Sequence, residues 1–376
     1  MRRDRQGLSG VSEMMTVGGL VRAPAFVDLH VHFREPGFAE KETIASGARA
    51  AAAGGYRAVC MMPNTRPAID CAETLMTVDR LGREAGEAGG VHVLAVSAMT
   101  IGQAGLELVD LDAMDAAETR CKELTGHGVC GVSEDGKTLA DLVLMEEVCL
   151  RAARLGLVVM DHAEPEAETI RRDVWLARRT GARVHIQHVS LAESVRLIRD
   201  AKAAGAPVTC ETAPHYIALT SAALREQGAD AKMNPPLAAE RDRMALIEGL
   251  CDGTIDCIAT DHAPHEAAAK AGSVDAAANG IVGLETAFPV CYTVLVKGGY
   301  MTLDELVRLM ATRPAEIIGL PPADDSYVLL DLSTSYEIDR NTFRTKGRST
   351  PFHGMPVCGR VMQTVIDGRS AYVSAK

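Results

Sequence analysis

The sequence predicts an α/β fold, a (β/α)8 TIM barrel that carries a small β appendage. Eight short apolar segments alternate with helix-forming segments over roughly 240 residues, the pattern of a closed parallel sheet. Polar residues recur directly after these apolar segments, where barrel enzymes place their chemistry. No Gly-x-Gly-x-x-Gly motif follows a predicted strand, so a doubly wound open sheet is the weaker alternative.

Apolar, β-branched stretches bounded by turn residues place the barrel strands. They are expected at residues 25–33, 56–62, 92–99, 128–132, 157–160, 183–188, 207–212 and 256–260. The helices between them are expected at residues 41–53, 71–88, 116–124, 140–155, 165–179, 191–204 and 240–250. Two further helices, at residues 284–297 and 302–318, complete the α-rich part of the chain.

Composition divides the chain into three parts. Residues 1–24 form a short N-terminal segment with one weak strand signal, and residues 25–322 form the barrel. From residue 323 onward the pattern changes to short β segments, and Asp367-Gly368 is typical of a hairpin turn. These strands are expected at residues 327–332, 355–358, 360–366 and 371–373.

The composition is that of an ordinary soluble globular protein, with 47% hydrophobic and 24% charged residues in a chain of 376. The net charge of -11, without a basic cluster, argues against a nucleic acid or an anionic membrane as partner. None of the ten cysteines forms a Cys-x-x-Cys pair, so we expect free thiols in a reducing compartment. We find neither a secretory signal nor an apolar run of membrane-spanning length, which predicts a cytoplasmic protein.

The first barrel strand carries the first chemical signal. Side chains on a strand alternate between its faces, so Asp28, His30 and His32 share one side. Two imidazoles two residues apart can bind one metal ion, although a lone His-x-His pair is more often a hydrogen-bonded core feature. Asp28 lies deeper along the strand, and we expect it to form buried hydrogen bonds.

The other strand ends favour the metal. Residues of ligand type stand at the ends of five predicted strands: His30, His32, Asp135, His162, His188 and Asp261. Four imidazoles and two carboxylates at one rim suit two divalent ions, with zinc the usual choice for such nitrogen and oxygen donors. One carboxylate would bridge the ions, and another would transfer protons during hydrolysis. Glu134 and Lys137 remain alternatives to Asp135 as the bridging group.

Several motifs extend this pattern along the chain. They are His-Val-His-Phe-Arg-Glu-Pro-Gly (30–37), Met-Pro-Asn-Thr (62–65), Gln-His-Val-Ser (187–190), Met-Asn-Pro-Pro-Leu (233–237), Ala-Thr-Asp-His-Ala-Pro-His (259–265), Asn-Gly-Ile-Val-Gly-Leu-Glu-Thr (279–286) and Ser-Thr-Pro-Phe-His-Gly (349–354). From about residue 24 to the C-terminus the sequence resembles the dihydroorotases of the amidohydrolase superfamily. It is most similar to the bacterial type I branch, in which an aspartate replaces a bridging carbamylated lysine.

The resemblance implies a role for each residue of the constellation. His30, His32, His162 and His188 would bind two zinc ions, Asp135 would bridge them, and Asp261 would be both ligand and general acid/base. Arg34 and Asn64, helped by His265, would hold the substrate carboxylate. Asn234 and the backbone near Gly280 would line the substrate ring.

The resemblance also implies the reaction, reversible hydrolysis of the cyclic amide of dihydroorotate to N-carbamoyl-aspartate in pyrimidine synthesis. A hydroxide bridging the metals would be the nucleophile. A guanidinium at Arg34 agrees with this substrate, because it can grip a carboxylate with two hydrogen bonds in an otherwise acidic protein.

The chain departs from the family pattern in two places. The segment before the first barrel strand is short, so we expect an incomplete β-sandwich, and the interval from His162 to His188 is shorter than usual. A homo-oligomer such as a dimer, or an association with aspartate transcarbamoylase, would cover exposed edges.

Two other functions stay open. One is a cyclic amidase of the allantoinase or hydantoinase type, against which Arg34 and Asn64 argue, since those substrates lack the ring carboxylate. The other is an inactive structural partner of aspartate transcarbamoylase. The presence of all six ligand residues argues against that second alternative.

Overall fold

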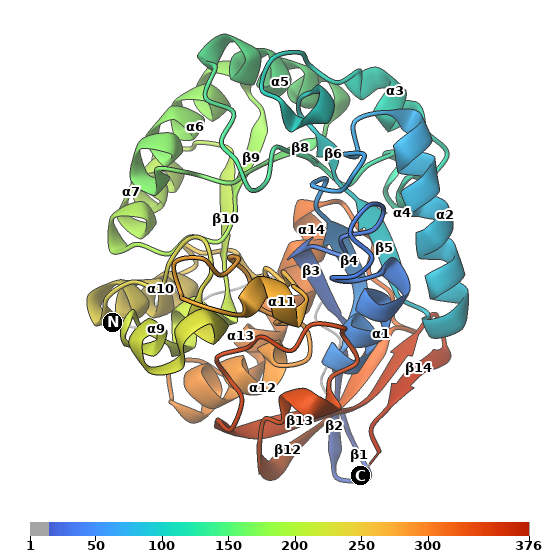
Figure 1. The fold of residues 1–376 in the computed structure, drawn as a ribbon, viewed down its shortest axis with the longest axis vertical. Helices are drawn as coiled ribbons and strands as arrows, with labels where there is room; N and C mark the ends of the chain where they lie inside the picture. Colours follow the sequence, from blue (N-terminus) through green and yellow to red (C-terminus); the bar gives the residue numbers. More distant parts are fainter. Residues whose placement is uncertain (1–14, 376) are drawn as a thin grey trace.

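The computed structural model describes residues 15–375 and confirms the predicted barrel, whose parallel strands are surrounded by helices (Figure 1). The barrel strands are β3 (Phe26–Val31), β4 (Tyr56–Met61), β5 (His92–Ala95) with its continuation β6 (Ser97–Ala98), β7 (Val132–Ser133), β8 (Val158–Asp161), β9 (Arg183–Ile186), β10 (Val208–Thr212) and β11 (Cys257–Ile258). Several strands end before their predicted limits, because the polar residues that follow turn into loops at the barrel rim.

The barrel is closed between its first and last strands. Val31 forms a parallel bridge with His262, and the backbone N–H of His32 donates to the carbonyl oxygen of His262 at 2.8 Å. Below this bridge the Asp28 carboxylate accepts hydrogen bonds from the backbone N–H (3.1 Å) and the hydroxyl (2.6 Å) of Thr260. Asp28 thus forms the buried hydrogen bonds expected of it, and they tie β3 to β11.

The helices between the strands form the outer layer seen in Figure 1. They are α1 (Ile44–Gly54), α2 (Ala72–Gly89), α3 (Leu111–Ala116), α4 (Arg120–Thr125), α5 (Leu142–Leu155), α6 (Glu166–Thr180), α7 (Ala192–Ala203), α10 (Glu240–Asp252), α12 (Ala287–Cys291), α13 (Leu303–Val307) and α14 (Arg313–Ile317). Shorter helices lie in the loops: α8 (Pro214–Ala218), α9 (Ala222–Gln227) and α11 (Ala267–Lys270). The short interval between His162 and His188 still holds α6, so the barrel unit is complete there.

The helix predicted at 116–124 is present as α4, but it starts only at Arg120, and a separate short helix, α3, precedes it. Asp110 accepts a hydrogen bond from the backbone N–H of Ala113, and Thr119 accepts one from that of Lys122, each at 3.1 Å. Each cap starts its own helix, α3 or α4, and the chain between them is extended. The two predicted C-terminal helices are interrupted by π-helical turns at Tyr292–Lys297 and Arg308–Thr312.

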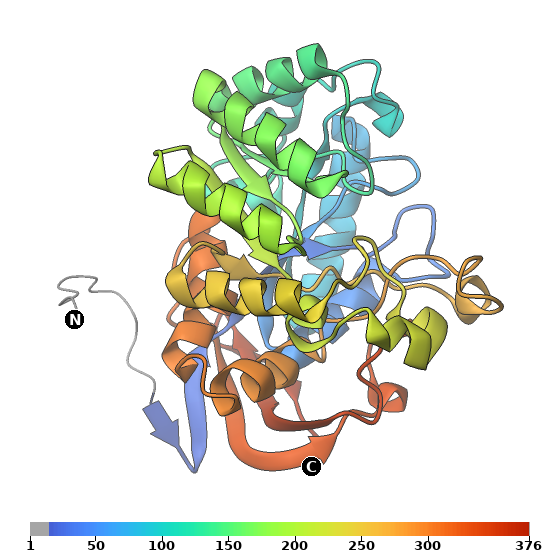
Figure 2. The same cartoon turned by 90° about the vertical axis from the view of Figure 1, so that its left-hand side faces the viewer.

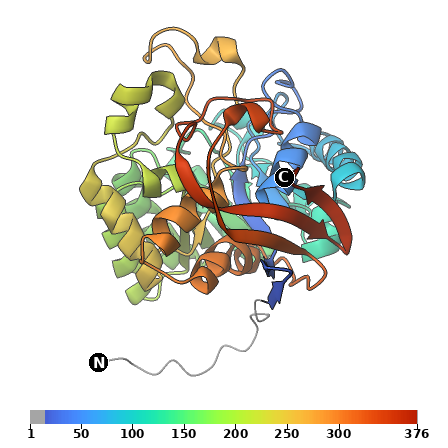
Figure 3. The same cartoon turned by 90° about the horizontal axis from the view of Figure 1, so that it is seen from below.

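The appendage is a five-stranded antiparallel sheet beside α1 and α12 (Figures 1 and 3). Its strands, in spatial order, are β1 (Met15–Val17), β2 (Leu20–Pro24), β12 (Tyr327–Glu337), β13 (Pro356–Ile366) and β14 (Arg369–Val373). The β1–β2 hairpin projects from the body of the molecule (Figure 2). In residues 15–375 this is the only sheet outside the barrel, so no second sheet completes a sandwich with it. The predicted N-terminal segment and the C-terminal appendage therefore share one sheet.

Candidate metal centre and active site

All six residues of the predicted ligand set meet at the carboxyl ends of the barrel strands. His30 lies on β3, and the other five lie in the turns that follow their strands. None of the six side chains belongs to a residue that is more than 7% exposed. Their residues are His30, His32, Asp135, His162, His188 and Asp261.

One group of donors comes from the first, fourth and eighth strands. His30 Nε2 lies 3.1 Å from Asp135 Oδ1, and His32 Nε2 lies 3.2 Å from Asp261 Oδ1. His32 Nε2 is also 3.5 Å from Asp135 Oδ2. Ligand atoms around a tetrahedral ion at about 2.0–2.1 Å are roughly 3.4 Å apart. These separations therefore suit the edges of one coordination shell.

A second group of donors comes from the fifth and sixth strands and also lies near Asp135. His162 Nδ1 is 2.8 Å from His188 Nε2 and 3.7 Å from Asp135 Oδ1. Asp135 consequently faces both groups, with Oδ1 near His30 and His162 and Oδ2 near His32. A carboxylate in this position can bridge two cations.

The neighbours of Asp135 point elsewhere. The Glu134 carboxylate accepts hydrogen bonds from the backbone N–H groups of Met99 and Thr100, each at 3.1 Å, and from the Thr100 hydroxyl. The ammonium of Lys137 donates to the carbonyl oxygen of Gln103 at 3.0 Å. Of the three alternatives left by the sequence, the structure brings Asp135 to the cluster.

Hydrogen bonds fix the orientation of the two histidines of the first strand. The amide oxygen of Asn64 lies 2.9 Å from His32 Nδ1, and its amide nitrogen donates to Asp135 Oδ2 at 3.0 Å. Glu211 Oε1, on β10, lies 3.0 Å from His30 Nδ1. Sequence reasoning missed Glu211, whose only local signal is a carboxylate within an otherwise uncharged buried strand.

The electrostatics of the cluster favour a cation. Burial raises the pKa of Asp135, but His30 and His32 outweigh it and hold that pKa well below its usual range. The pKa of Asp261 is also lowered, since the hydrogen bond from His32 and the charge of His30 outweigh its burial. Both carboxyls are therefore ionised at neutral pH, the form that binds metals. Burial lowers the pKa of His188 to about 3, which keeps this imidazole neutral, as a ligand must be.

Backbone strain also collects at this rim. Arg34, His188 and Asp261 adopt positive φ angles of 60°, 33° and 47°, and they are three of the five non-glycine residues that do so between residues 15 and 375. Such conformations cost about 1–3 kcal/mol each and persist where the surrounding structure enforces them, commonly at functional sites.

A cavity of about 260 Å³ opens above the cluster and receives the predicted substrate-binding residues. It is lined by His32, Arg34, Asn64, Asp135, Gly136, His162, His188, Asn234, Asp261, Ala263, His265, Asn279 and Gly280. Arg34 Nε is buried and has no hydrogen-bond partner in the described part of the chain. Gly280 has φ of 126°, and a Cβ there would lie 2.6 Å from the carbonyl oxygen of Ala263, so only glycine fits.

Close packing between α1 and Phe33 helps to hold the strand end that carries Arg34. Gly47 of α1 lies against the ring of Phe33, where an added Cβ would come within 2.3 Å of a ring carbon. The absent side chain lets the helix approach the strand end that carries Arg34. His265 Nε2 is 2.8 Å from the carbonyl oxygen of Asn279, which leaves its buried Nδ1 without a partner among the described residues.

Comparison with known proteins identifies the family. Residues 22–323 match the model of the Amidohydrolase family. The chain belongs to the amidohydrolase family. A curated relative named dihydroorotase, from Brevibacillus brevis, is 41% identical over 392 residues, covering 94% of this chain and 88% of that protein. Another of that name, from Lactiplantibacillus plantarum, is 42% identical and covers 93% of this chain and 86% of its own length.

Solved structures confirm the amidohydrolase fold. L-Hydantoinase (dihydropyrimidinase) from Arthrobacter aurescens superposes with a TM-score of 0.84 at 24% identity, covering 96% of this chain and 88% of that chain. A dihydropyrimidinase from Brevibacillus agri gives 0.79 at 21% identity, covering 94% and 85%. Identities this low establish the fold alone.

Membership of this family implies a divalent metal ion, and the donor set fits one. The donor atoms of His30, Asp135 and His188, and those of His30, His32 and Asp261, lie within 4.8 Å of one another. His30 Nε2 belongs to both groups and has no hydrogen-bond partner among the described residues. An unpartnered, buried imidazole nitrogen among carboxylates is a site for a cation.

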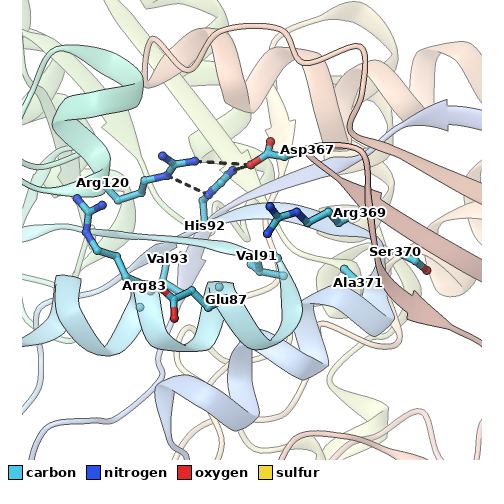
Figure 4. Close-up of a pocket in the computed structure, with 13 residues that line it drawn as sticks. Arg83, Glu87, Val91, His92, Val93, Arg120, Asp367, Arg369, Ser370 and Ala371 are labelled. Atoms are coloured by element: carbon cyan, nitrogen blue, oxygen red, sulfur yellow. Dashed lines mark hydrogen bonds and ion pairs between the residues drawn. The ribbon is translucent and has the colours of Figure 1, made fainter.

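A larger cavity, of about 460 Å³, lies away from this rim between α2, α4 and β14 (Figure 4). Arg120 and His92 both face the carboxylate of Asp367, at 3.6 and 3.2 Å, and Arg83 is paired with Glu123 at 2.8 Å. Because carboxylates pair these cations, the cavity offers little net charge to attract an anionic substrate. The smaller cavity over the histidine cluster is the candidate active site of this amidohydrolase.

Proposed function

We propose that this amidohydrolase is a dihydroorotase, which hydrolyses the cyclic amide of (S)-dihydroorotate reversibly to N-carbamoyl-L-aspartate. The observation that carries the proposal is the guanidinium of Arg34 in the wall of the cavity over the metal cluster, because its buried Nε has no hydrogen-bond partner among residues 15–375. A substrate with a ring carboxylate next to a hydrolysable amide uses both features at once. Relatives named dihydroorotase, about 40% identical over nearly the whole chain, support the same assignment.

The proposed cofactor is a pair of zinc ions. His30, His32 and Asp261 would hold one ion, His162 and His188 the other, and Asp135 would bridge them. Nitrogen and oxygen donors at these separations suit zinc. When bound, the ions would activate the attacking water and polarise the ring carbonyl.

Substrate binding in this proposal falls to the remaining residues of the cavity. Arg34 would bind the carboxylate through two hydrogen bonds, with Asn64 and His265 beside it. Asn234 and the backbone at Gly280 would contact the pyrimidine ring. Asn64 already contacts His32 and Asp135, so it would link substrate binding to the orientation of the metal ligands.

Asp261 is the proposed general acid/base. Its ionised carboxylate would accept the proton of the attacking water as the new C–O bond forms. The same proton would then pass to the ring nitrogen as the C–N bond breaks, which gives a carbamoyl N–H and a carboxylic acid. The acid would release the second proton of the water to solvent and become the product carboxylate. Placed next to His32, at 3.2 Å, Asp261 lies within the cluster where the water would be held.

A hydrolysis assay on the zinc-loaded protein tests this proposal. We expect turnover of dihydroorotate, and a loss of about 10²–10⁴-fold in kcat in Asp261→Asn with the circular dichroism spectrum retained. The matched control is Asp256→Asn, which changes a buried carboxylate at the opposite end of the same strand and should keep turnover.

A substrate panel separates the alternatives. Faster turnover of hydantoin or allantoin than of dihydroorotate would support the other cyclic amidases. Zinc-loaded protein without activity on any of these substrates would support an inactive partner of aspartate transcarbamoylase. An Asp261→Asn variant as active as the wild type would exclude the assigned acid/base role.

The oligomeric state and the cytoplasmic location stay predictions. β1 and β14 are the edges of the five-stranded sheet, and the exposed Val17 and Val373 lie on them. We propose a homodimer, or an association with aspartate transcarbamoylase, that covers such an edge; light scattering of the protein with and without that enzyme distinguishes the two. No helix in residues 15–375 is long and apolar enough to cross a membrane.

A further inference from the structure

A chain of buried hydrogen bonds connects the side of the barrel to the metal cluster. The Glu211 carboxylate uses both oxygens: Oε1 lies 3.0 Å from His30 Nδ1, and Oε2 lies 3.1 Å from His185 Nε2. His185 Nδ1 is in turn 2.8 Å from the hydroxyl of Thr209. Glu211 and His185 are at most 1% exposed, so the two bonds of the Glu211 carboxylate are shielded from solvent.

This arrangement determines which nitrogen of His30 carries the proton. An ionised carboxylate only accepts hydrogen bonds, so His30 Nδ1 must be the N–H that donates to Glu211. The amide nitrogen of Gln187 lies 3.2 Å from the same ring nitrogen, but an amide NH2 donates and cannot take over this role. In the neutral form of His30, which is the form that binds a metal ion, Nε2 then carries the lone pair, and it faces Asp135 Oδ1 at 3.1 Å inside the cluster.

We propose that Glu211 is a positioning residue of the metal centre: it holds His30 in the tautomer and ring orientation that present Nε2 to a metal ion. His185 and Thr209 anchor Glu211 in this role. The inference rests on the proposed metal-dependent function and extends it to a residue that does not touch the substrate cavity. A carboxylate behind a ligating imidazole also increases the basicity of that ligand.

The same residues do not form a metal site of their own. His185, Glu211 and Cys257 lie close enough together to suggest one. However, both nitrogens of His185 and both oxygens of Glu211 already have hydrogen-bond partners. His30 Nε2, in contrast, has none among the described residues. The series of hydrogen bonds therefore runs from Thr209 through His185 and Glu211 to His30 at the cluster.

A purely structural role for Glu211 is the weaker explanation. A buried carboxylate costs desolvation free energy, and apolar residues of similar volume are often as stable or more stable in such positions. What an apolar residue cannot do is accept the Nδ1–H of His30. The difference should therefore appear in metal binding more than in the stability of the metal-free protein.

The test compares the full-length wild type with Glu211→Gln, which keeps the size of the side chain and removes its charge. Zinc affinity is measured by competition with a chromophoric chelator, and the visible spectrum is recorded with cobalt(II) in place of zinc. We expect zinc to bind roughly 10–100-fold more weakly in Glu211→Gln, with altered cobalt absorption bands. The melting temperature of the metal-free protein should change little.

Asp256→Asn is the matched control, because Asp256 is a buried carboxylate paired with Arg313 at 2.8 Å and makes no contact with the cluster. It should alter stability without altering zinc affinity. If Glu211→Gln does not fold, His185→Leu decides, since it removes the donor to Glu211 and should weaken zinc binding to a smaller extent. Wild-type zinc affinity and an unchanged cobalt spectrum in the folded variant would overturn the proposal.

Both readouts are taken without substrate, so they separate this inference from the proposed reaction. A wild type that does not hydrolyse dihydroorotate, together with weakened zinc binding in Glu211→Gln, would refute the substrate and leave the positioning role standing.

Discussion

At the scale of single residues, Arg34 distinguishes this site from a general amide-hydrolysing cluster. It follows His32 by two residues, so one strand end supplies metal ligands and a cation for the substrate. Burial lowers the pKa of its guanidinium, and the charges of Asp261 and Asp135 act in the opposite direction. An arginine remains protonated in such a site. A positive charge therefore lies beside the cluster, where a substrate carboxylate can bind.

We predict that Arg34→Met lowers kcat/KM for dihydroorotate by about 10²–10³-fold, since losing one partner of a buried charge pair costs about 3–4 kcal/mol. Dihydrouracil, which has the same ring without the carboxylate, should be affected far less. Steady-state kinetics on both substrates measure the difference, with Arg49→Met on the exposed face of α1 as control. An equal loss on both substrates would contradict carboxylate binding by Arg34.

The local pattern of the sequence predicts the metal-ligand residues well, but it does not predict the residues that hydrogen-bond to those ligands. Each of the six ligand residues stands at the end of an apolar strand, so its position follows from the fold class. The contact of Glu211 with His30 joins residues 181 apart in the sequence. It depends on the register between strands, which no local pattern records.

At the scale of elements, long-range pairing sets lengths that the sequence does not reveal. β12 extends to Glu337, beyond its predicted end at 332, because Ser335, Tyr336 and Glu337 find partners on β13. A register shift after Asp331 interrupts the alternation of side chains and hides the continuation. Likewise, the cap at Asp110 starts α3 before the predicted helix at 116–124, and the cap at Thr119 starts α4 later than that prediction.

The loop after β12 is attached to the barrel through Glu285. Its carboxylate oxygen accepts hydrogen bonds from the backbone N–H groups of Arg344, at 2.7 Å, and Thr345, at 3.1 Å. Burial nevertheless raises the pKa of Glu285 from 4.5 to about 7. The folded state therefore favours the protonated form of this group.

This pKa predicts how stability changes with pH. The stabilising contribution of protonated Glu285 is complete below about pH 4.5 and is lost as the pH rises toward 7, because only the unfolded chain ionises in this window. We expect a loss of about 2–3 kcal/mol between pH 4.5 and 7 that is absent from Glu285→Gln. Denaturant unfolding of both proteins across this range measures it; parallel pH profiles would contradict the assignment.

At the scale of the whole molecule, the barrel closes through its own backbone, independently of the ligand cluster at its rim. Parallel pairing runs around the barrel and returns from β11 to β3 through the bridge between Val31 and His262. The fold therefore does not depend on a metal for its connectivity, although four imidazoles and two carboxylates meet at one end.

We predict that removal of metal by a chelator leaves the secondary structure intact and lowers the melting temperature by several degrees. A ligand at about 1,000 times its dissociation constant stabilises the folded state by about 4 kcal/mol. Far-ultraviolet circular dichroism and calorimetry of chelated and zinc-reconstituted protein measure the two effects. Loss of the helical signal on chelation would show instead that the metal is required for folding.

Because the two ends of the chain share one sheet, that sheet can form only late in synthesis of the protein. β2 pairs with β12, so Pro24 finds its partner Tyr327 about 300 residues later in synthesis. At roughly 5–20 residues per second, the ribosome needs about 15–60 seconds to produce that partner. Until then the backbone edge of β2 that later pairs with β12 lacks its partner, which leaves it open to association with other chains.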